Sequence, residues 1–185
     1  MYQPSEDTLL LAESVREYEG KLALEIGVGS GEVSRVLCQK FSCVIGTDID
    51  FASLKFCRGN LPGKVALVCC DSASSLRARF DLIVSNPPYL PLENGEEQDK
   101  TIHGGVRGNV TTLHFLDSAK SLLDENGKMI ILSSSLSNHQ DLLSGLHLLG
   151  LKSRVLRSRR LFFETLFILE ITLKFDPLNG VSCCF

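Results

Sequence analysis

The sequence predicts an α/β fold, a Rossmann-like and mostly parallel sheet of seven strands with helices on both faces. Short apolar runs that suit buried strands alternate with segments that suit amphipathic helices over most of the 185 residues. The strand runs are almost continuously apolar, as expected when helices cover both faces of a parallel sheet. The last two runs are joined by too short a link for a parallel crossover, so this C-terminal pair must be antiparallel.

The predicted elements follow one another in a regular order. Ser5 is a residue type that caps helices, and Leu11, Val15 and Tyr18 share one face of the segment that follows it. The predicted helices are residues 5–18, 32–39, 51–58, 111–123 and 138–149. The predicted strands are residues 22–26, 43–47, 65–69, 80–85, 128–132, 151–156 and 166–173. We expect one domain, residues 1–175, and a flexible tail, residues 176–185.

The composition bounds the class of protein. Hydrophobic residues make up 44% of the chain and charged residues 22%, which is ordinary for a globular domain with a sizeable core. The net charge of −3 disfavours extended nucleic-acid binding. No apolar stretch reaches the ~18 residues of a membrane helix, and no signal peptide opens the chain.

The seven cysteines show neither disulfide-like nor CxxC spacing. Five of them lie inside apolar helix or strand patterns and are expected to be reduced core thiols: Cys38, Cys43, Cys57, Cys69 and Cys70. Reduced thiols are typical of the cytoplasm, and we expect a cytoplasmic protein with no metal site.

The most informative motif is Asn86-Pro87-Pro88-Tyr89, which closes the apolar run at residues 80–85. Two prolines cannot continue a sheet ladder, because each lacks an N–H and has a fixed φ, so they hold a rigid loop. We expect this loop to point the Asn86 side-chain oxygen and the Pro87 carbonyl into open space, followed by the ring of Tyr89. Asn-Pro alone usually marks a turn. Two acceptors and a ring after a buried strand favour a site for a planar N–H₂ group, an amide or a base amine.

A glycine-rich turn follows the first predicted strand. Gly27, Gly29 and Gly31 alternate with other residues, which lets the backbone turn tightly and approach a ligand. Their G-x-G-x-G spacing differs from the G-x-G-x-x-G of dinucleotide sites. Glu25 precedes them and would meet a cationic group of the ligand rather than a phosphate.

Acidic residues end the next two strands. Asp48 is placed to bind ribose hydroxyls, and Asp71, which precedes Ser72, could accept a hydrogen bond from an adenine amine. The carboxyl ends of neighbouring parallel strands are where open α/β sheets bind ligands. Together with Glu25, these residues fit a cationic adenosine compound without a diphosphate. S-adenosyl-L-methionine, with S-adenosyl-L-homocysteine as its product, is the obvious candidate.

These motifs resemble those of class I S-adenosylmethionine-dependent methyltransferases over residues 1–174. Within that class, the chain looks like the HemK-type glutamine N5-methyltransferases of translation termination factors. Residues 86–89 are similar to the family's amide-binding motif, and residues 25–31 to its cofactor loop. Residues 2–8 resemble the opening of the eukaryotic and archaeal branch.

The resemblance implies an activity and a set of site residues. The reaction is N5-methylation of the glutamine side-chain amide in the Gly-Gly-Gln motif of a class I termination factor. The implied cofactor-binding residues are Thr8, Glu25, Gly27, Gly29, Asp48, Asp71, Ser72 and Asn86. The implied substrate-binding residues are Asn86, Pro87, Pro88, Tyr89 and Leu90. Of these, Asn86, Pro87 and Tyr89 are expected to act in catalysis.

The resemblance also implies a partner, because enzymes of this branch work with a small zinc-binding activator subunit. A class I sheet places its third strand at one edge, and residues 64–70 carry a single charge, at Lys64. An apolar free edge lacks the features that normally block strand pairing. We therefore expect a 1:1 heterodimer in which the activator pairs with this edge. The alternative is an edge covered by residues 62–63 or 71–79 of the same chain.

Two other functions stay open. An adenine-N6 or other nucleic-acid amine methyltransferase would use the same motif, although the negative net charge and the lack of a target-recognition domain disfavour it. A catalytically idle scaffold is disfavoured by the intact motifs. Four arginines near the last strands would form a solvated edge or touch RNA: Arg154, Arg157, Arg159 and Arg160. No general base is evident, because His103 is expected on an exposed loop and His114 on a helix surface.

Overall fold

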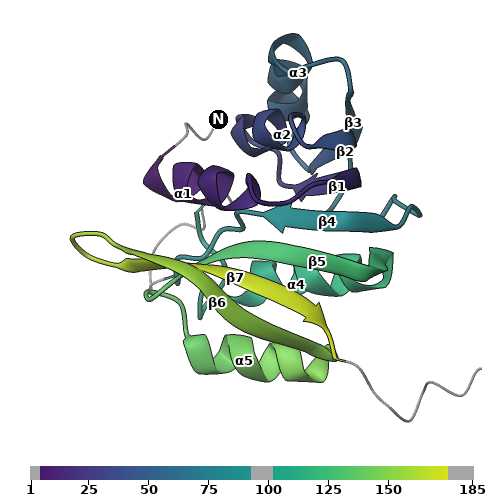
Figure 1. The fold of residues 1–185 in the computed structure, drawn as a ribbon. Coiled ribbons are helices and arrows are strands. Elements are labelled where there is room, and N and C mark those ends of the chain that lie inside the picture. The colour runs from purple at the N-terminus through teal and green to yellow at the C-terminus, as the bar shows by residue number, and fades with distance from the viewer. Residues whose placement is uncertain (1–4, 93–101, 175–185) are drawn as a thin grey trace, which may run out of the picture.

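The computed structural model describes residues 5–92 and 102–174, and the predicted tail at 176–185 and residues 2–4 of the opening motif lie outside this part (Figure 1). Seven strands in the described part form one sheet in the order β3-β2-β1-β4-β5-β7-β6. The strands are β1 (Gly20–Ile26), β2 (Phe41–Asp48), β3 (Val65–Cys69), β4 (Phe80–Ser85), β5 (Leu123–Ser134), β6 (Leu151–Arg160) and β7 (Thr165–Leu173). The helices are α1 (Glu6–Val15), α2 (Glu32–Leu37), α3 (Phe51–Asn60), α4 (Val110–Ala119) and α5 (His139–Leu148).

The strand pairing confirms the predicted fold class. Strands β3, β2, β1, β4 and β5 pair in parallel, whereas β5–β7 and β6–β7 are antiparallel. Strand β6 runs four residues further than predicted, so its loop to β7 is only residues 161–164. The predicted helix at 111–123 ends earlier, in a 3₁₀ turn at Lys120–Leu122, because β5 already begins at Leu123.

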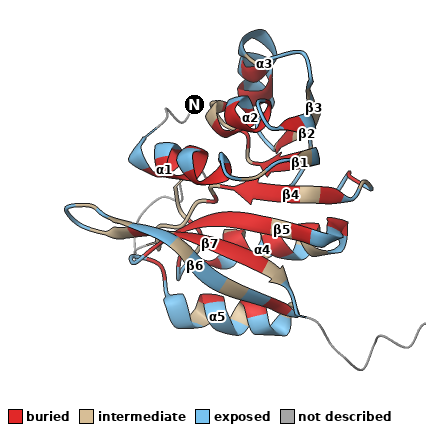
Figure 2. Cartoon of the chain, in the orientation of Figure 1, coloured by how far each residue is buried: buried red, intermediate tan, exposed pale blue. Residues whose placement is uncertain are grey.

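The core lies in two layers, one on each face of the sheet. Neighbouring residues of a strand point to opposite faces, and Ala23, Leu82 and Ile130 accordingly pack with α1 and α2. Leu24 and Ile83 pack on the other face, with α4 and α5. Figure 2 shows the central strands buried between these layers. The prediction of helices on both faces is confirmed.

Two sequence expectations are wrong in detail. Ser5 is the N-cap residue of α1, but its hydroxyl donates to the Asp7 carboxylate and accepts no capping hydrogen bond. Cys69 is exposed rather than part of the core, because β3 is an edge strand with one face open to solvent. Cys38 and Cys57 are buried free thiols, as expected. None of the helices within residues 5–92 and 102–174 has the length and apolarity to cross a membrane.

Candidate active site

The glycine turn after β1 is open toward solvent at two of its three glycines. Gly27, Gly29 and Gly31 have φ values of +75°, +47° and +79°, which glycine adopts without steric cost. A Cβ added to Gly31 would come within 3.0–3.1 Å of Cys57 and Leu61, so Gly31 serves packing. A Cβ added to Gly27 or Gly29 would meet nothing closer than 3.9 Å. The backbone of these two residues therefore borders free space that a ligand can enter.

Asp48, at the end of β2, holds this turn in place. The Gly29 N–H donates to Asp48 Oδ2 at 3.0 Å, and the Asp50 N–H donates to Asp48 Oδ1 at 2.9 Å. The N–H groups of Gly27 and Val28 both donate to the carbonyl of Thr47, the residue before Asp48, at 2.8 and 2.9 Å. Each carboxylate oxygen has a second lone pair. Asp48 is half-exposed and keeps the capacity to accept hydrogen bonds from a ligand's hydroxyl groups.

Glu25 is a carboxylate enclosed beneath the turn. The residue is 4% exposed, and the Ser34 hydroxyl donates a hydrogen bond to its Oε2. Burial raises the pKa of Glu25 from its ordinary 4.5 to about 8. A buried carboxylate is costly unless a cation or hydrogen bonds compensate it. Its position next to the open turn supports the expectation that a cationic group of the ligand lies nearby.

Glu25 should make the stability of the free chain depend on pH. Because the folded-state pKa is raised, the folded chain keeps a proton that the unfolded chain releases above pH 4.5. Stability is therefore full below pH 4.5 and is lost as the pH rises to about 8, by an amount on the order of 3–5 kcal/mol. Chemical denaturation of the parent and of Glu25→Gln across this window measures it. The glutamine variant should be the more stable one at pH 8.

The half-exposed Glu32 provides the matched control, because it lies in the first turn of α2, near the same site. Glu32→Gln should keep the pH-dependent loss of stability, with a slightly lower midpoint, because the charge of Glu32 contributes a small part of the raised pKa of Glu25. If the Glu25→Gln profile also ran parallel to that of the parent, the carboxylate of Glu25 would not be held in its protonated form.

Asp71 and Ser72 follow β3 in a strained turn. Ser72 has a φ of +53°, a value that a non-glycine residue adopts only at a cost of roughly 1–2 kcal/mol. Asp71 Oδ1 accepts hydrogen bonds from the Ser72 hydroxyl at 2.8 Å and from His114 Nε2 at 2.9 Å. The His114 contact is the main cause that lowers the pKa of Asp71. Strain held by specific contacts is typical of ligand sites.

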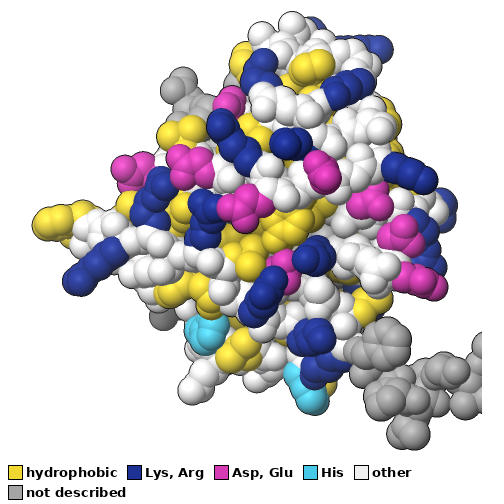
Figure 3. Space-filling model, in the orientation of Figure 1, with side chains coloured by type: hydrophobic (Ala, Val, Ile, Leu, Met, Phe, Trp, Pro, Cys, Tyr) yellow, Lys and Arg dark blue, Asp and Glu magenta, His cyan; other side chains and the backbone are white. Residues whose placement is uncertain are grey.

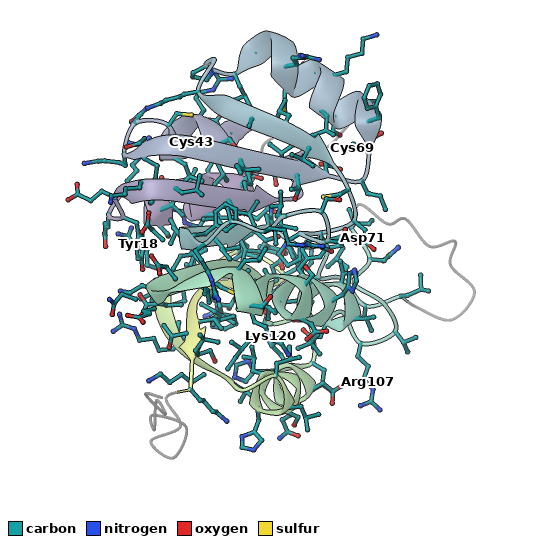
Figure 4. The ribbon with its side chains drawn as sticks, turned by 90° about the vertical axis from the view of Figure 1, so that its right-hand side faces the viewer. Tyr18, Cys43, Cys69, Asp71, Arg107 and Lys120 are labelled. Atoms are coloured by element: carbon teal, nitrogen blue, oxygen red, sulfur yellow. The ribbon has the colours of Figure 1, made fainter. Side chains whose placement is uncertain are left out.

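The two histidines differ from their expected surroundings. His114 is exposed on α4 as predicted, but it pairs with Asp71, a contact that its sequence position did not reveal. His103 is half-buried rather than on an exposed loop, because its backbone forms a bridge with Leu90. In Figure 4, Asp71 and Arg107 lie on the same side of the molecule, away from Tyr18.

Asn86 is fixed by α1, which lies over the end of β4. Its Nδ2 donates to Asp7 Oδ2 at 3.1 Å and lies 3.5 Å from Thr8 Oγ1. An ionised carboxylate can only accept, so Asp7 sets which end of the amide faces it. Asn86 Oδ1 then points the other way, is buried and has no hydrogen-bond partner within the described ranges. The expectation that this oxygen points into open space is therefore wrong, because the folded chain buries it.

An unpaired buried acceptor is rare and calls for an explanation, since leaving it unsatisfied costs about 1–3 kcal/mol. Thr47 Oγ1, at the carboxyl end of β2, is likewise buried without a hydrogen-bond partner in the described part of the chain. Asn86 directly follows the carboxyl end of β4, the end of the sheet at which open α/β folds bind ligands. Asp7 is the residue of this site that the sequence reasoning missed, because nothing in the sequence links it to Asn86, 79 residues away.

The rest of the motif is more enclosed than expected. Pro87 is buried, whereas Pro88, Tyr89 and Leu90 are half-buried. The ring of Tyr89 packs partly against the core, and its hydroxyl lies 3.5 Å from Asp7 Oδ2. The expectation of an open aromatic face is thus met only in part. A Cβ at Gly104 or Gly108 would come within 2.3–2.4 Å of the carbonyl oxygens of this loop, so glycine is required where residues 104–108 pack against it.

The arginine cluster near the last strands is mostly paired within the chain. Arg154 contacts Glu170 at 2.7 Å, Arg159 contacts Glu13 at 2.9 Å, and Arg157 contacts Glu17. Pairing with glutamates reduces the positive potential that a nucleic acid would need.

The sheet order and the site at the carboxyl ends of β1, β2 and β4 define a class I methyltransferase. Residues 5–147 match the family model described as the methyltransferase small domain, and the chain belongs to this family. It is similar to human methyltransferase HEMK2, with 30% identity over 93% of this chain and 89% of that one. It is also similar to a Methanocaldococcus jannaschii protein provisionally named protein N5-glutamine methyltransferase, with 29% identity over 92% and 90%.

A solved structure shares the fold over nearly the whole chain. The Mtq2-Trm112 complex of E. cuniculi, described as responsible for methylation of the eRF1 translation termination factor, contains a chain with a TM-score of 0.77. The identity to that chain is 26%, and the match covers 93% of this chain and 98% of that one. These findings confirm the HemK-type resemblance and show that the protein is a methyltransferase.

Proposed function

We propose that this enzyme transfers a methyl group from S-adenosyl-L-methionine to a glutamine side-chain amide in the Gly-Gly-Gln motif of a class I translation termination factor. The observation that carries the proposal is the buried, unpartnered Oδ1 of Asn86, a residue that follows β4 where the glycine turn follows the neighbouring β1. The names of the M. jannaschii relative and of the E. cuniculi complex support the same substrate class. Such a substrate places the reaction in the cytoplasm.

The residues at the strand ends fit this cofactor. S-adenosylmethionine supplies a methyl group already activated on a sulfonium. The cationic end would favour ionisation of Glu25, whose pKa burial raises in the free chain, and the open backbone at Gly27 and Gly29 would leave room for the ligand. Asp48 would accept from the ribose hydroxyls, with Asp71 and Ser72 beside the adenine. Thr8 would border the cofactor next to Asn86.

The chain acts on the substrate chiefly through two acceptors. An amide nitrogen is a poor nucleophile, because its lone pair is delocalised into the carbonyl. Asn86 Oδ1 and the Pro87 carbonyl would accept its two N–H groups, and these bonds strengthen as positive charge develops on nitrogen. Tyr89 would limit the approach of the flat amide, while Pro88 and Leu90 line the substrate side. Alignment for in-line displacement is the main contribution, and the proton leaves to water.

Asp7 should act as a positioning residue in this arrangement. An asparagine in its place could offer an N–H as well as an oxygen, so Asp7→Asn would no longer dictate the orientation of Asn86. We expect kcat to fall by about 10- to 100-fold, the effect of about 1.5–3 kcal/mol for a charged hydrogen bond. The affinity for S-adenosylmethionine, measured by calorimetry, should change much less than kcat.

The exposed Glu6, in the same turn of α1, provides the control. Glu6→Gln should retain parental kinetics. A kcat for Asp7→Asn within twofold of the parent would show that Asp7 only stabilises the N-terminus of α1.

The substrate class can be tested with radiolabelled S-adenosylmethionine in a filter-binding assay. Methylation of a termination factor that disappears in its Gly-Gly-Gln to Gly-Gly-Ala form supports the proposal. Equal labelling of both forms or preferential labelling of DNA would contradict it, and the second result would favour the nucleic-acid amine methyltransferase. The absence of labelling with every substrate, despite cofactor binding, would indicate an idle scaffold.

A small zinc-binding activator is the partner we propose, through the free edge of the sheet. Strand β3 pairs with β2 on one side, and in the described part of the chain its other side carries no strand. The side chains of Ala66 and Cys69 on this strand are exposed. The Trm112 subunit named in the E. cuniculi complex supports a partner of this kind. Strand addition would satisfy the free backbone groups of the edge.

We expect low solubility of the chain alone and a stable 1:1 heterodimer on co-expression. Ala66→Lys should weaken the heterodimer by at least tenfold in Kd, because a charge would lie in a newly formed strand pair, whereas cofactor affinity should persist. Ser158→Lys, at an exposed position on the opposite edge strand β6, is the control. A soluble, monodisperse and fully active chain without any partner would refute the prediction.

A further inference from the structure

The loop between β6 and β7 exposes two adjacent aromatic side chains. Phe162 is 92% exposed and Phe163 is 85% exposed. Their rings pack edge to face, with centroids 4.6 Å apart and an interplanar angle of 82°. Single exposed apolar residues are common on protein surfaces, but a contiguous pair of rings on a projecting loop is typical of an interaction site. Figure 3 shows hydrophobic atoms at the projecting end of this hairpin.

The hairpin projects from the end of the sheet at which β1, β2 and β4 have their carboxyl ends, the same end as the candidate active site. Thr165 N donates to Ser135 Oγ, and Ser135 N donates to the Thr165 carbonyl, both at 2.9 Å. The base of the loop is thus attached just beyond the carboxyl end of β5. Strand β5 runs parallel to β4, whose carboxyl end leads into Asn86. Figure 1 shows the hairpin extending past α1 at this same end of the sheet.

The hairpin is braced against the helix that also fixes Asn86. Arg159 on β6 contacts Glu13 of α1 at 2.9 Å, and Arg157 contacts Glu17 just after the helix. The same helix carries Asp7, which accepts from Asn86 Nδ2. Within the loop, the Leu161 N–H donates to the Glu164 carbonyl at 2.8 Å. The base of the hairpin, and with it the loop that carries the two rings, is therefore attached near the site.

We propose that Phe162 and Phe163 dock the protein substrate through an apolar surface patch that lies apart from the methylated glutamine. The inference rests on the proposed function. Rigid aromatic side chains are frequent anchors of protein–protein contacts. The neighbouring Arg157 and Arg159 are paired with glutamates, which disfavours a nucleic acid as the occupant. The proposed activator edge, β3, lies at the other end of the strand order.

Loss of the two rings should impair methylation of a whole termination factor but not of a short peptide substrate. A peptide that contains Gly-Gly-Gln reaches the site but not the hairpin tip. In the double variant Phe162→Ser/Phe163→Ser, assayed as the complex with the activator, kcat/KM for the whole factor should fall at least tenfold, through KM. Values of kcat for the factor and of kcat/KM for the peptide should stay within twofold of the parent. Leu148→Ser, at an 85% exposed apolar residue on α5, is the matched control.

Binding of the Gly-Gly-Ala form of the factor, measured by calorimetry, tests the docking without chemistry. A tenfold weaker affinity of the double variant supports the proposal. Unchanged affinity, an equal loss of activity toward factor and peptide, or loss of the activator instead would overturn it. If the parent complex binds the factor through the rings but methylates neither substrate, the docking surface stands and the proposed reaction fails.

Discussion

Replacing Asn86 by alanine is expected to lower turnover on the glutamine substrate by about 10²-fold or more, the usual effect of removing one preorganised polar group that acts in the transition state. The variant loses the buried acceptor Oδ1, whose bond to the amide N–H should strengthen as charge develops on nitrogen. Affinity for S-adenosylmethionine should fall far less. Single-turnover kinetics with the termination factor, together with calorimetry of cofactor binding, measure the two effects separately.

The control for this variant is Asn60→Ala. Asn60 is exposed at the end of α3, where its Nδ2 donates to the Phe56 carbonyl. This change removes the same amide group at a position away from the site and should leave turnover at the parental value. Near-parental turnover of Asn86→Ala would show that the Asn-Pro-Pro-Tyr loop is only structural.

The order of the elements was predictable from the sequence because each strand that is buried on both faces is an apolar run. The end of β6 was not predictable in this way. Residues 157–160 include three arginines, which show no apolar alternation, yet they form a strand because each pairs with β7. The ion pairs of Arg159 with Glu13 of α1 and of Arg157 with Glu17, just after this helix, add to this pairing. Contacts between distant parts of the chain therefore decided the length of the hairpin.

In the candidate site, too, the locally determined features were predictable from the sequence and the tertiary contacts were not. The glycine turn and the Asn-Pro-Pro-Tyr loop were predictable because their backbone conformations are set locally, by glycine and proline. The hydrogen-bond partners of the site residues could not be predicted in this way. Asp7 lies 79 residues from Asn86, and His114 lies 43 residues from Asp71. The orientation of the Asn86 amide depends on its contact with Asp7 of α1, which no local pattern encodes. Sequence motifs here predict the position of the chemistry, and the tertiary contacts determine its geometry.

The largest loss of cofactor affinity is expected for Gly27→Val. A side chain at this residue would enter the free space beside the turn, where a Cβ meets nothing closer than Phe115 at 3.9 Å. The proposed cofactor would occupy the same space, so the side chain and the cofactor should exclude each other. We expect S-adenosylmethionine affinity to fall by at least about 100-fold, since about 2.7 kcal/mol suffices for this factor. Calorimetry on the folded variant measures the affinity.

Backbone strain must be separated from this steric effect, because Gly27 has a φ of +75° and a β-branched residue there is strained by about 1–2 kcal/mol. Gly150 offers the matched position. Its φ is +71°, a Cβ there would meet nothing within 4 Å, and it lies in the turn before β6, at the edge strand farthest from β3. Gly150→Val should lose a similar amount of stability and bind the cofactor with parental affinity. If both valine variants bound S-adenosylmethionine equally well, the free space beside Gly27 would not be the cofactor site.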